Sequence, residues 1–138
     1  MILSPTGADA MLTGNFSALC NTGYIRIYSG TVPTSATGAL GGAVLLGEGR
    51  FGATAFGAPA TSGNARRITA NAMTGDTAAD AGGVPAFARI LQTDGTTVMA
   101  QCTVSASGGG GELTIDVSPV VQNAPLNFSG FYVELSIV

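Results

Sequence analysis

Few side chains in this sequence have the chemistry that enzyme sites need. The 138 residues include no histidine, and all five basic residues are arginines. A Ser-His-Asp or Cys-His nucleophile needs an imidazole, and a P-loop or a Schiff base needs a lysine. Cys20 and Cys102 stand far apart and, with scattered carboxylates, make a poor zinc set. We therefore predict a protein that is not an enzyme, with no catalytic, cofactor or metal site.

Two acidic residues could contradict that prediction by forming a metal or catalytic site. Asp76 and Asp80 share one glycine-containing loop, and oxygen-rich loops can hold calcium. Paired carboxylates can also hydrolyse glycosides, at a separation that sequence spacing does not fix. Aspartate is equally favoured in loops because its side chain makes local turn hydrogen bonds. We favour the local hydrogen bonds, and a carboxylate hydrolase ranks last among the functions considered.

Residues 47–52 match the dinucleotide-binding pattern G-x-G-x-x-G and follow an apolar segment. The dinucleotide site also requires a helix beginning there and an acidic residue about 20 positions later. The segment that follows, FGATAFGAPATSG, cannot sustain a helix, and the next acid is Asp76. We therefore predict a turn at residues 47–52 and no nucleotide site.

Tyrosine and arginine side chains supply the candidate interface. Tyr24, Arg26 and Tyr28 alternate along one predicted strand and so point the same way. Tyrosine and arginine are enriched at binding hot spots, which suggests a contact stripe. The alternative is a strand face covered by a helix or loop, with Arg26 paired to an acid. Arg89 lies inside another predicted strand, where we expect a paired or interfacial guanidinium, whereas Arg66 and Arg67 are expected at a loop exit.

The composition excludes several classes of partner. Charged residues make up 9% of the chain and the net charge is −3, against roughly 25% charged residues in ordinary domains. Five scattered arginines cannot form the basic stripe that nucleic acid requires. No run approaches the ~20 apolar residues of a membrane helix, and the first residues do not resemble a secretory signal. We therefore expect no nucleic acid and no membrane partner, and we expect both cysteines to be buried free thiols.

The elements that position these side chains are mostly strands. Residues 8–20 show a helical period of apolar positions, and Asn21-Thr22-Gly23 offers its end. Asp94-Gly95 stands between two alternating segments, the strongest short signal for a hairpin. The segments expected as strands are 24–30, 43–46, 51–56, 67–73, 84–91, 97–104, 112–117 and 131–137.

This pattern predicts a mainly β fold. About seven to eight short strands with one short N-terminal helix favour an antiparallel β-sandwich, jelly-roll-like in type. The chain length fits one domain over 1–138, with an N-terminal arm and helix at 1–23 and the sandwich at 24–138.

Several segments resemble small virion proteins of tailed bacteriophages and prophages. The resemblance rests on an ordered set of motifs covering roughly two thirds of the chain. The segments are IRIYSGTVP (25–33), LLGEG and FGATAFGAPA within 45–60, and ITANAMTGDTAADAGGVPAFARILQTDGTTV (68–98). None of these motifs is catalytic, so the resemblance implies a fold and a context.

The implied function is that of a structural part of the phage particle. We expect a capsid decoration or cement protein, forming a homotrimer and bound to the major capsid protein or to other virion proteins. It would be made in the host cytoplasm and lie on the outer surface of the capsid, because mild acidity suits that surface better than one lining DNA. The alternatives are a head–tail junction or tail structural protein and a carbohydrate-binding host-attachment module.

Overall fold

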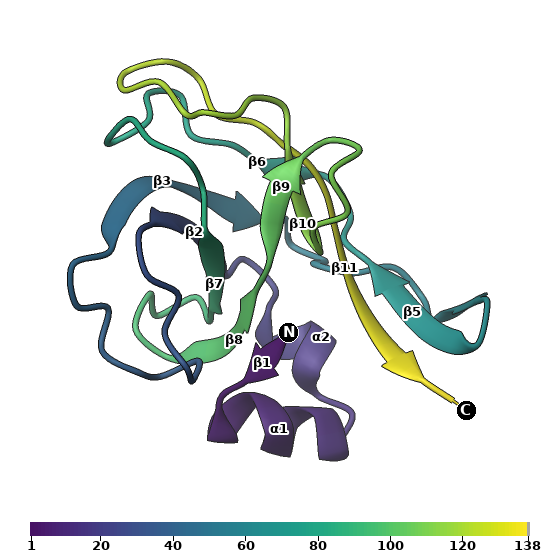
Figure 1. Cartoon of the computed structure of the whole chain (residues 1–138). Coiled ribbons are helices and arrows are strands. Elements are labelled where there is room, and N and C mark those ends of the chain that lie inside the picture. Colours follow the sequence, from purple (N-terminus) through teal and green to yellow (C-terminus); the bar gives the residue numbers. More distant parts are fainter. Residues whose placement is uncertain (138) are drawn as a thin grey trace.

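Two β-sheets enclose a shared core, and two short helices lie at one end (Figure 1). The computed structural model describes residues 1–137. Strands hold 42% of the chain and helices 9%, so the predicted mainly β class is confirmed. Within the described residues there are eleven strands, more than the seven or eight expected, because several consist of only two or three residues.

The first sheet has six strands in the order β1-β8-β7-β2-β3-β6, and all its pairs are antiparallel. Its strands are β1 (Ile2–Leu3), β2 (Tyr24–Ser29), β3 (Val44–Phe51), β6 (Met73–Thr74), β7 (Phe87–Leu91) and β8 (Val98–Cys102).

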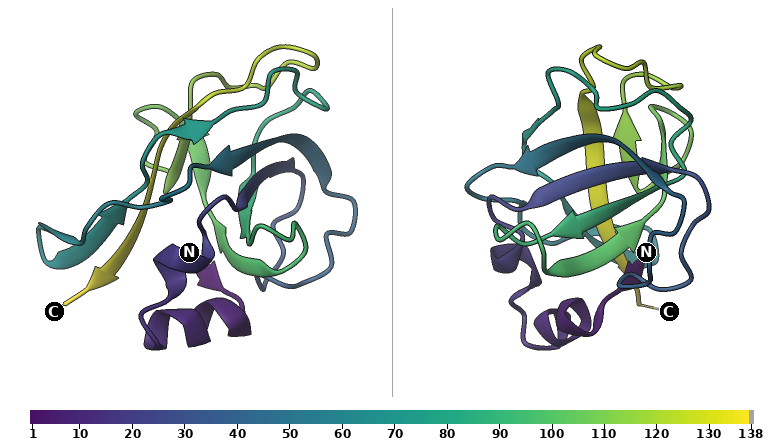
Figure 2. Two further views of the ribbon diagram at one scale, coloured as in Figure 1. Left: turned by 180° about the vertical axis from the view of Figure 1, so that it is seen from behind. Right: turned by 90° about the vertical axis from the view of Figure 1, so that its left-hand side faces the viewer.

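The second sheet has five strands in the order β4-β5-β11-β10-β9. The β9–β10 pair is parallel, whereas the other pairs are antiparallel. In the right-hand view of Figure 2, β11 runs behind the first sheet and crosses its strands steeply. The strands are β4 (Ala60–Ser62), β5 (Ala65–Thr69), β9 (Val104–Ala106), β10 (Leu113–Ile115) and β11 (Phe128–Ser136).

The N-terminal helix predicted at 8–20 is two helices, α1 (Pro5–Leu12) and α2 (Phe16–Leu19). The Ser4 hydroxyl accepts a hydrogen bond from the Gly7 amide at 3.0 Å, and Pro5 follows at the first helical position, so α1 begins earlier than expected. Gly14 has a φ of +74° and interrupts the helix between the two segments.

The turn predicted at residues 47–52 is wrong, because most of that segment lies inside β3. Glycine in a strand interior marks a place where another chain segment approaches closely. A Cβ atom on Gly47 would lie 2.8 Å from Leu126 Cδ2, and one on Gly49 would overlap the ring of Phe128. Gly47 and Gly49 therefore make room for later parts of the chain.

The β7–β8 hairpin is confirmed at the Asp94-Gly95 turn. The Asp94 carboxylate accepts hydrogen bonds from the amides of Thr96 and Thr97, each at 2.9 Å. The first strand begins at Phe87 and not at residue 84, and Val84 is 67% exposed. Every residue of β7 is buried, so both faces of this strand are covered.

The core fills the space between the two sheets with aliphatic side chains and a group of phenylalanines. Phe51, Phe56 and Phe131 form a triangle with ring centroids 5.4 to 5.9 Å apart, and Phe16 of α2 joins it at 6.2 Å from Phe56. Cys20 and Cys102 are free and buried, as expected. The N-terminal helices therefore close one end of the core.

Candidate functional site

The predicted interface residues lie on one face of the first sheet. Arg26 stands opposite Glu48 of β3 on one side and opposite Arg89 of β7 on the other. Arg89 in turn stands opposite Gln101 of β8. Because directly opposed residues share a face, these four side chains form one row across the sheet.

Arg26 is paired to an acid, as expected under the alternative to the contact stripe. Its Nε lies 2.5 Å from Glu48 Oε2, and its Nη1 donates to the Gly95 carbonyl at 3.0 Å. Burial lowers the pKa of Arg26, but the hydrogen bond and the charge of Glu48 outweigh that effect and hold the pKa above its ordinary value. The guanidinium is therefore fixed at the end of the row nearest the hairpin turn.

Arg50 joins this end of the row, which sequence reasoning missed. Its guanidinium carbon lies 4.2 Å from the centre of the Tyr24 ring, and that of Arg26 lies 5.5 Å from it. Arg50 also donates to the Thr22 carbonyl, at 2.7 Å from Nη2. The pairing of Tyr24 with Arg50 across β2 and β3 brings it there, and no spacing in the sequence signals that pairing. We call Tyr24, Arg26, Glu48 and Arg50 the Tyr24 cluster.

The other two predicted interface residues are buried. Tyr28 is 6% exposed and stacks on Phe87 with ring centroids 5.1 Å apart. Arg89 is 7% exposed, and its Nη2 donates to the Gly38 carbonyl at 2.6 Å. Burial lowers the pKa of Arg89, and Tyr28 acts in the opposite direction. The loop at residues 30–43 thus covers this end of the row.

Gln101 completes the attachment of that loop. Its Nε2 donates to the Pro33 carbonyl at 2.7 Å, and its Oε1 lies 3.4 Å from Arg89 Nε. One buried guanidinium and one buried amide therefore hold two loop carbonyls. Only the Tyr24 cluster, at the opposite end of the row, keeps exposed side-chain surface for a partner.

The acidic loop uses its first carboxylate locally. Asp76 Oδ1 accepts from the Ala78 amide and Oδ2 accepts from the Glu48 amide, both at 3.0 Å. Asp80 is exposed. Among residues 1–137, no three His, Cys, Asp or Glu side chains lie close enough together to hold a metal ion. The local hydrogen bonds that we favoured for this loop are therefore present at Asp76.

A second candidate surface lies where one sheet extends past the core. β4, β5 and residues 132–136 of β11 project from the body of the molecule, beside the N-terminal helices (Figures 1 and 2). We call this part the wing. Arg66 and Arg67, expected at a loop exit, instead lie in β5 and pair with Leu135 and Glu134 of β11.

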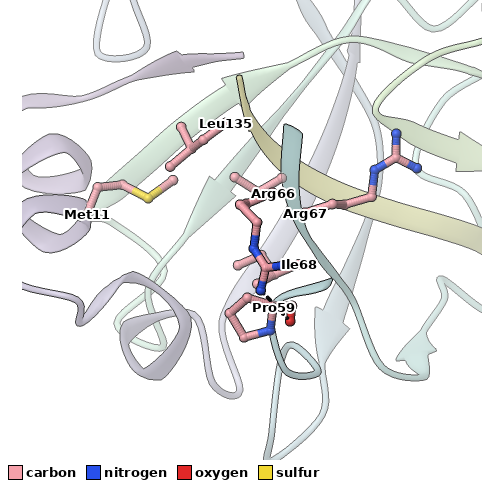
Figure 3. Close-up of a pocket in the computed structure, with 7 residues that line it drawn as sticks. Met11, Pro59, Arg66, Arg67, Ile68 and Leu135 are labelled. Atoms are coloured by element: carbon pink, nitrogen blue, oxygen red, sulfur yellow. Dashed lines mark hydrogen bonds between the residues drawn. The ribbon is translucent and has the colours of Figure 1, made fainter. Parts of the chain in front are cut away.

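The two faces of the wing differ in chemistry. On one face, Arg67 binds Glu134 at 2.6 and 2.7 Å and covers the ring of Tyr132 at 3.9 Å. On the other face, the paired residues Ile68 and Val133 are followed by Arg66 and Leu135. That second face is apolar except for the end of Arg66, and it faces Met11 of α1 (Figure 3).

A groove of about 220 Å³ separates the wing from α1. Figure 3 shows Met11 approaching Leu135 across the groove, and the Arg66 guanidinium turned toward Pro59. Leu135 of β11 is 57% exposed and Ile137, just after the strand, is 60% exposed, so the apolar alternation continues beyond the part that the core covers. The groove is lined by Met11, Pro59, Arg66, Arg67, Ile68, Val133 and Leu135.

Within residues 1–137, neither helix has the length and hydropathy needed to cross a bilayer. Comparison of the chain with protein-family models, with curated proteins and with solved structures finds no match. The Tyr24 cluster and the wing are therefore the two surfaces on which a function can be proposed.

Proposed function

We propose that this chain is a non-enzymatic structural protein of a tailed-phage virion, a capsid decoration or cement protein that stabilises the head through protein–protein contacts. The observation that carries the proposal is the uncovered apolar face of the wing with its groove. Contiguous exposed apolar surface of this kind marks an interaction site, and covering Leu135 and Ile137 would contribute roughly 1.5–3 kcal/mol for each side chain that becomes fully buried. A surface of this kind suits a protein that works within an assembly.

The low charge of the chain supports the same proposal. With 9% charged residues, the surface carries few of the groups that keep a free protein dispersed. A particle whose subunits cover one another tolerates such a surface better than a dilute soluble protein does.

The Tyr24 cluster is the surface that we assign to the capsid. An aromatic ring held beneath two guanidinium groups is pre-ordered, so little side-chain entropy is lost on binding. Arg50 is exposed and has no carboxylate partner among residues 1–137, which leaves its charge available to an acidic group on the major capsid protein. The chain would lie on the outer surface of the head as a homotrimer.

A carbohydrate-binding function has less support, because sugars stack on free aromatic rings. Arg50 covers Tyr24, Arg67 covers Tyr132, and Tyr28 stacks on Phe87. Each tyrosine therefore has a ring face already in use. A head–tail junction or tail position would use the same kinds of contact as the capsid surface and is the nearer alternative.

The proposal is tested with heads assembled from the major capsid protein encoded in the same genome. We expect the purified chain to sediment with these heads and to raise the temperature at which they break apart. The Tyr24→Ser, Arg50→Gln double variant should bind at least about tenfold more weakly, because it removes two hot-spot residue types. The control variant Val121→Ser should bind like the wild type.

Two results would overturn the proposal. One is a wild-type chain that stays in the supernatant and leaves the stability of the heads unchanged. The other is specific binding to a glycan on an array together with absence of the chain from purified particles, which would favour the host-attachment module.

A further inference from the structure

The groove between α1 and the wing has an apolar floor and one cation at its edge. Ile68, Val133 and Leu135 supply the floor. Arg66 donates to the Thr61 hydroxyl at 2.7 Å and to the Pro59 carbonyl at 3.0 Å, and it has no carboxylate partner within residues 1–137. A ligand that fits this groove needs an apolar side chain and a nearby carboxylate.

The outward face of α1 carries these two groups. Leu12 is 88% exposed, the largest value among the exposed large hydrophobic residues of the described chain. Asp9 is three residues earlier and exposed, and residues at this spacing are neighbours on a helix surface. The Asp9 carboxylate forms no hydrogen bond or ion pair with any residue in 1–137.

Leu12 cannot fill the groove of its own chain. The neighbouring residue Met11 already forms the α1 wall of that groove, and successive residues on a helix point about 100° apart. Ala10 is buried on the inner side, so the helix cannot rotate to exchange Met11 for Leu12 without exposing Ala10. The exposed leucine and the exposed groove therefore remain separate surfaces within one molecule.

We propose that α1 of a second copy of this chain occupies the groove, with Leu12 on the apolar floor and Asp9 paired to Arg66. This pairing of copies rests on the proposed function in one respect: it names a second copy of the chain as the neighbour that covers the groove in the assembly. The two surfaces complement each other in charge and polarity: the chain presents an acid and a leucine on one helix, and an arginine and an apolar groove beside that helix.

The two surfaces adjoin each other because Met11 and Leu12 are consecutive. A contact related by a two-fold axis would use both surfaces of both copies at once, and a head-to-tail contact repeated around a three-fold axis would use one surface of each copy per interface. Either closed assembly covers Leu12 and Leu135 in every copy. The outer part of β11 then becomes an interior element of the assembly.

Sedimentation velocity of the isolated full chain over about a hundredfold range of concentration tests the proposal. We expect a species of three times 13.6 kDa, the homotrimer proposed above; a species of twice that mass would keep the contact but replace the three-fold arrangement by a two-fold one. Leu12→Ser and Leu135→Ser should each weaken association by at least about tenfold, because each removes an apolar anchor. The control Val84→Ser removes an exposed apolar side chain far from the groove and should leave association unchanged.

Charge reversal tests the pairing itself. Asp9→Arg and Arg66→Glu should each shift the protein toward monomer, and the double variant should restore the oligomer. Circular dichroism of each variant checks that the fold is retained. If Arg66→Glu loosens the β4–β5 hairpin, the two leucine variants still test the contact, because they alter only exposed side chains. A wild-type chain that is monomeric throughout, or an oligomer indifferent to all four variants, would overturn the proposal.

The two proposals fail separately. A monomeric chain that still binds heads would refute the pairing of copies and the homotrimer, and it would keep the virion function. An oligomer that depends on Leu12 and Leu135 but ignores heads would do the opposite.

Discussion

Replacing Gly49 by alanine should destabilise the fold, whereas the same change at Gly52, in the same glycine-rich segment, should be neutral or stabilising. A Cβ atom on Gly49 would overlap the ring of Phe128 and would lie 2.5 Å from the carbonyl oxygen of Thr74. The ring can turn, but the carbonyl belongs to the backbone of β6, which must then shift away from β3. At Gly52 the nearest atom is the Ala72 carbonyl oxygen at 3.5 Å, an ordinary contact.

The two substitutions differ in sign as a result. Overpacking of a filled interior costs typically 1–3 kcal/mol, so Gly49→Ala should lower the free energy of unfolding by about 2–3 kcal/mol. Gly52 has no left-handed backbone conformation, and Gly→Ala at a compatible site stabilises by about 0.4–1 kcal/mol through the unfolded chain. Urea unfolding followed by far-ultraviolet circular dichroism measures both values. A Gly49→Ala protein as stable as the wild type would refute this explanation of the motif.

Three further predictions concern Arg89, Asp94 and the two cysteines. Arg89→Met should lower the free energy of unfolding by about 1–3 kcal/mol, because the Gly38 carbonyl loses its charged donor. Amide hydrogen exchange should rise in the loop at 30–43, and unchanged exchange would contradict the role of Arg89 in holding that loop. Hydrogen bonds from Thr97 lower the pKa of Asp94 to about 2, so the stabilisation that the carboxylate contributes is present above pH 3.8 and is lost as the pH falls through about 2. Asp94→Asn should remove this pH dependence of stability, and an NMR titration midpoint of Asp94 near 3.8 would refute the prediction. Burial raises the pKa of Cys20 to about 12 and also raises that of Cys102, so both thiols should react with a thiol-specific dye only after unfolding.

Local chemistry made parts of the fold predictable from the sequence. The hydrogen bonds of the Asp94 carboxylate in the Asp94-Gly95 turn come from the next few residues, and the hairpin around the turn forms as predicted. The segment 47–52 was predicted wrongly because Gly47 and Gly49 are required by the close approach of Leu126 and Phe128, which lie far along the chain. Sequence periodicity contains no information about such distant approaches, so a strand with two interior glycines looks like a turn.

The candidate surfaces were likewise predictable from the sequence only in part. Alternation placed Tyr24, Arg26 and Tyr28 on one face, but it could not show that the loop at 30–43 covers only one end of that face. Alternation in residues 131–137 likewise predicted a strand with one apolar face. Which part of that face the core covers depends on where the other sheet ends, and this is a property of the packed molecule.

The proposal that this chain is a structural component of a phage particle, covered by its neighbours, is tested most directly by reconstruction of the particles produced from the genome that carries it. We predict density for the chain on the outer surface of the head, with the wing groove filled and the Tyr24 cluster against the major capsid protein. Particles that contain no copy of the chain, or copies whose groove and Tyr24 cluster both face solvent, would contradict the proposal.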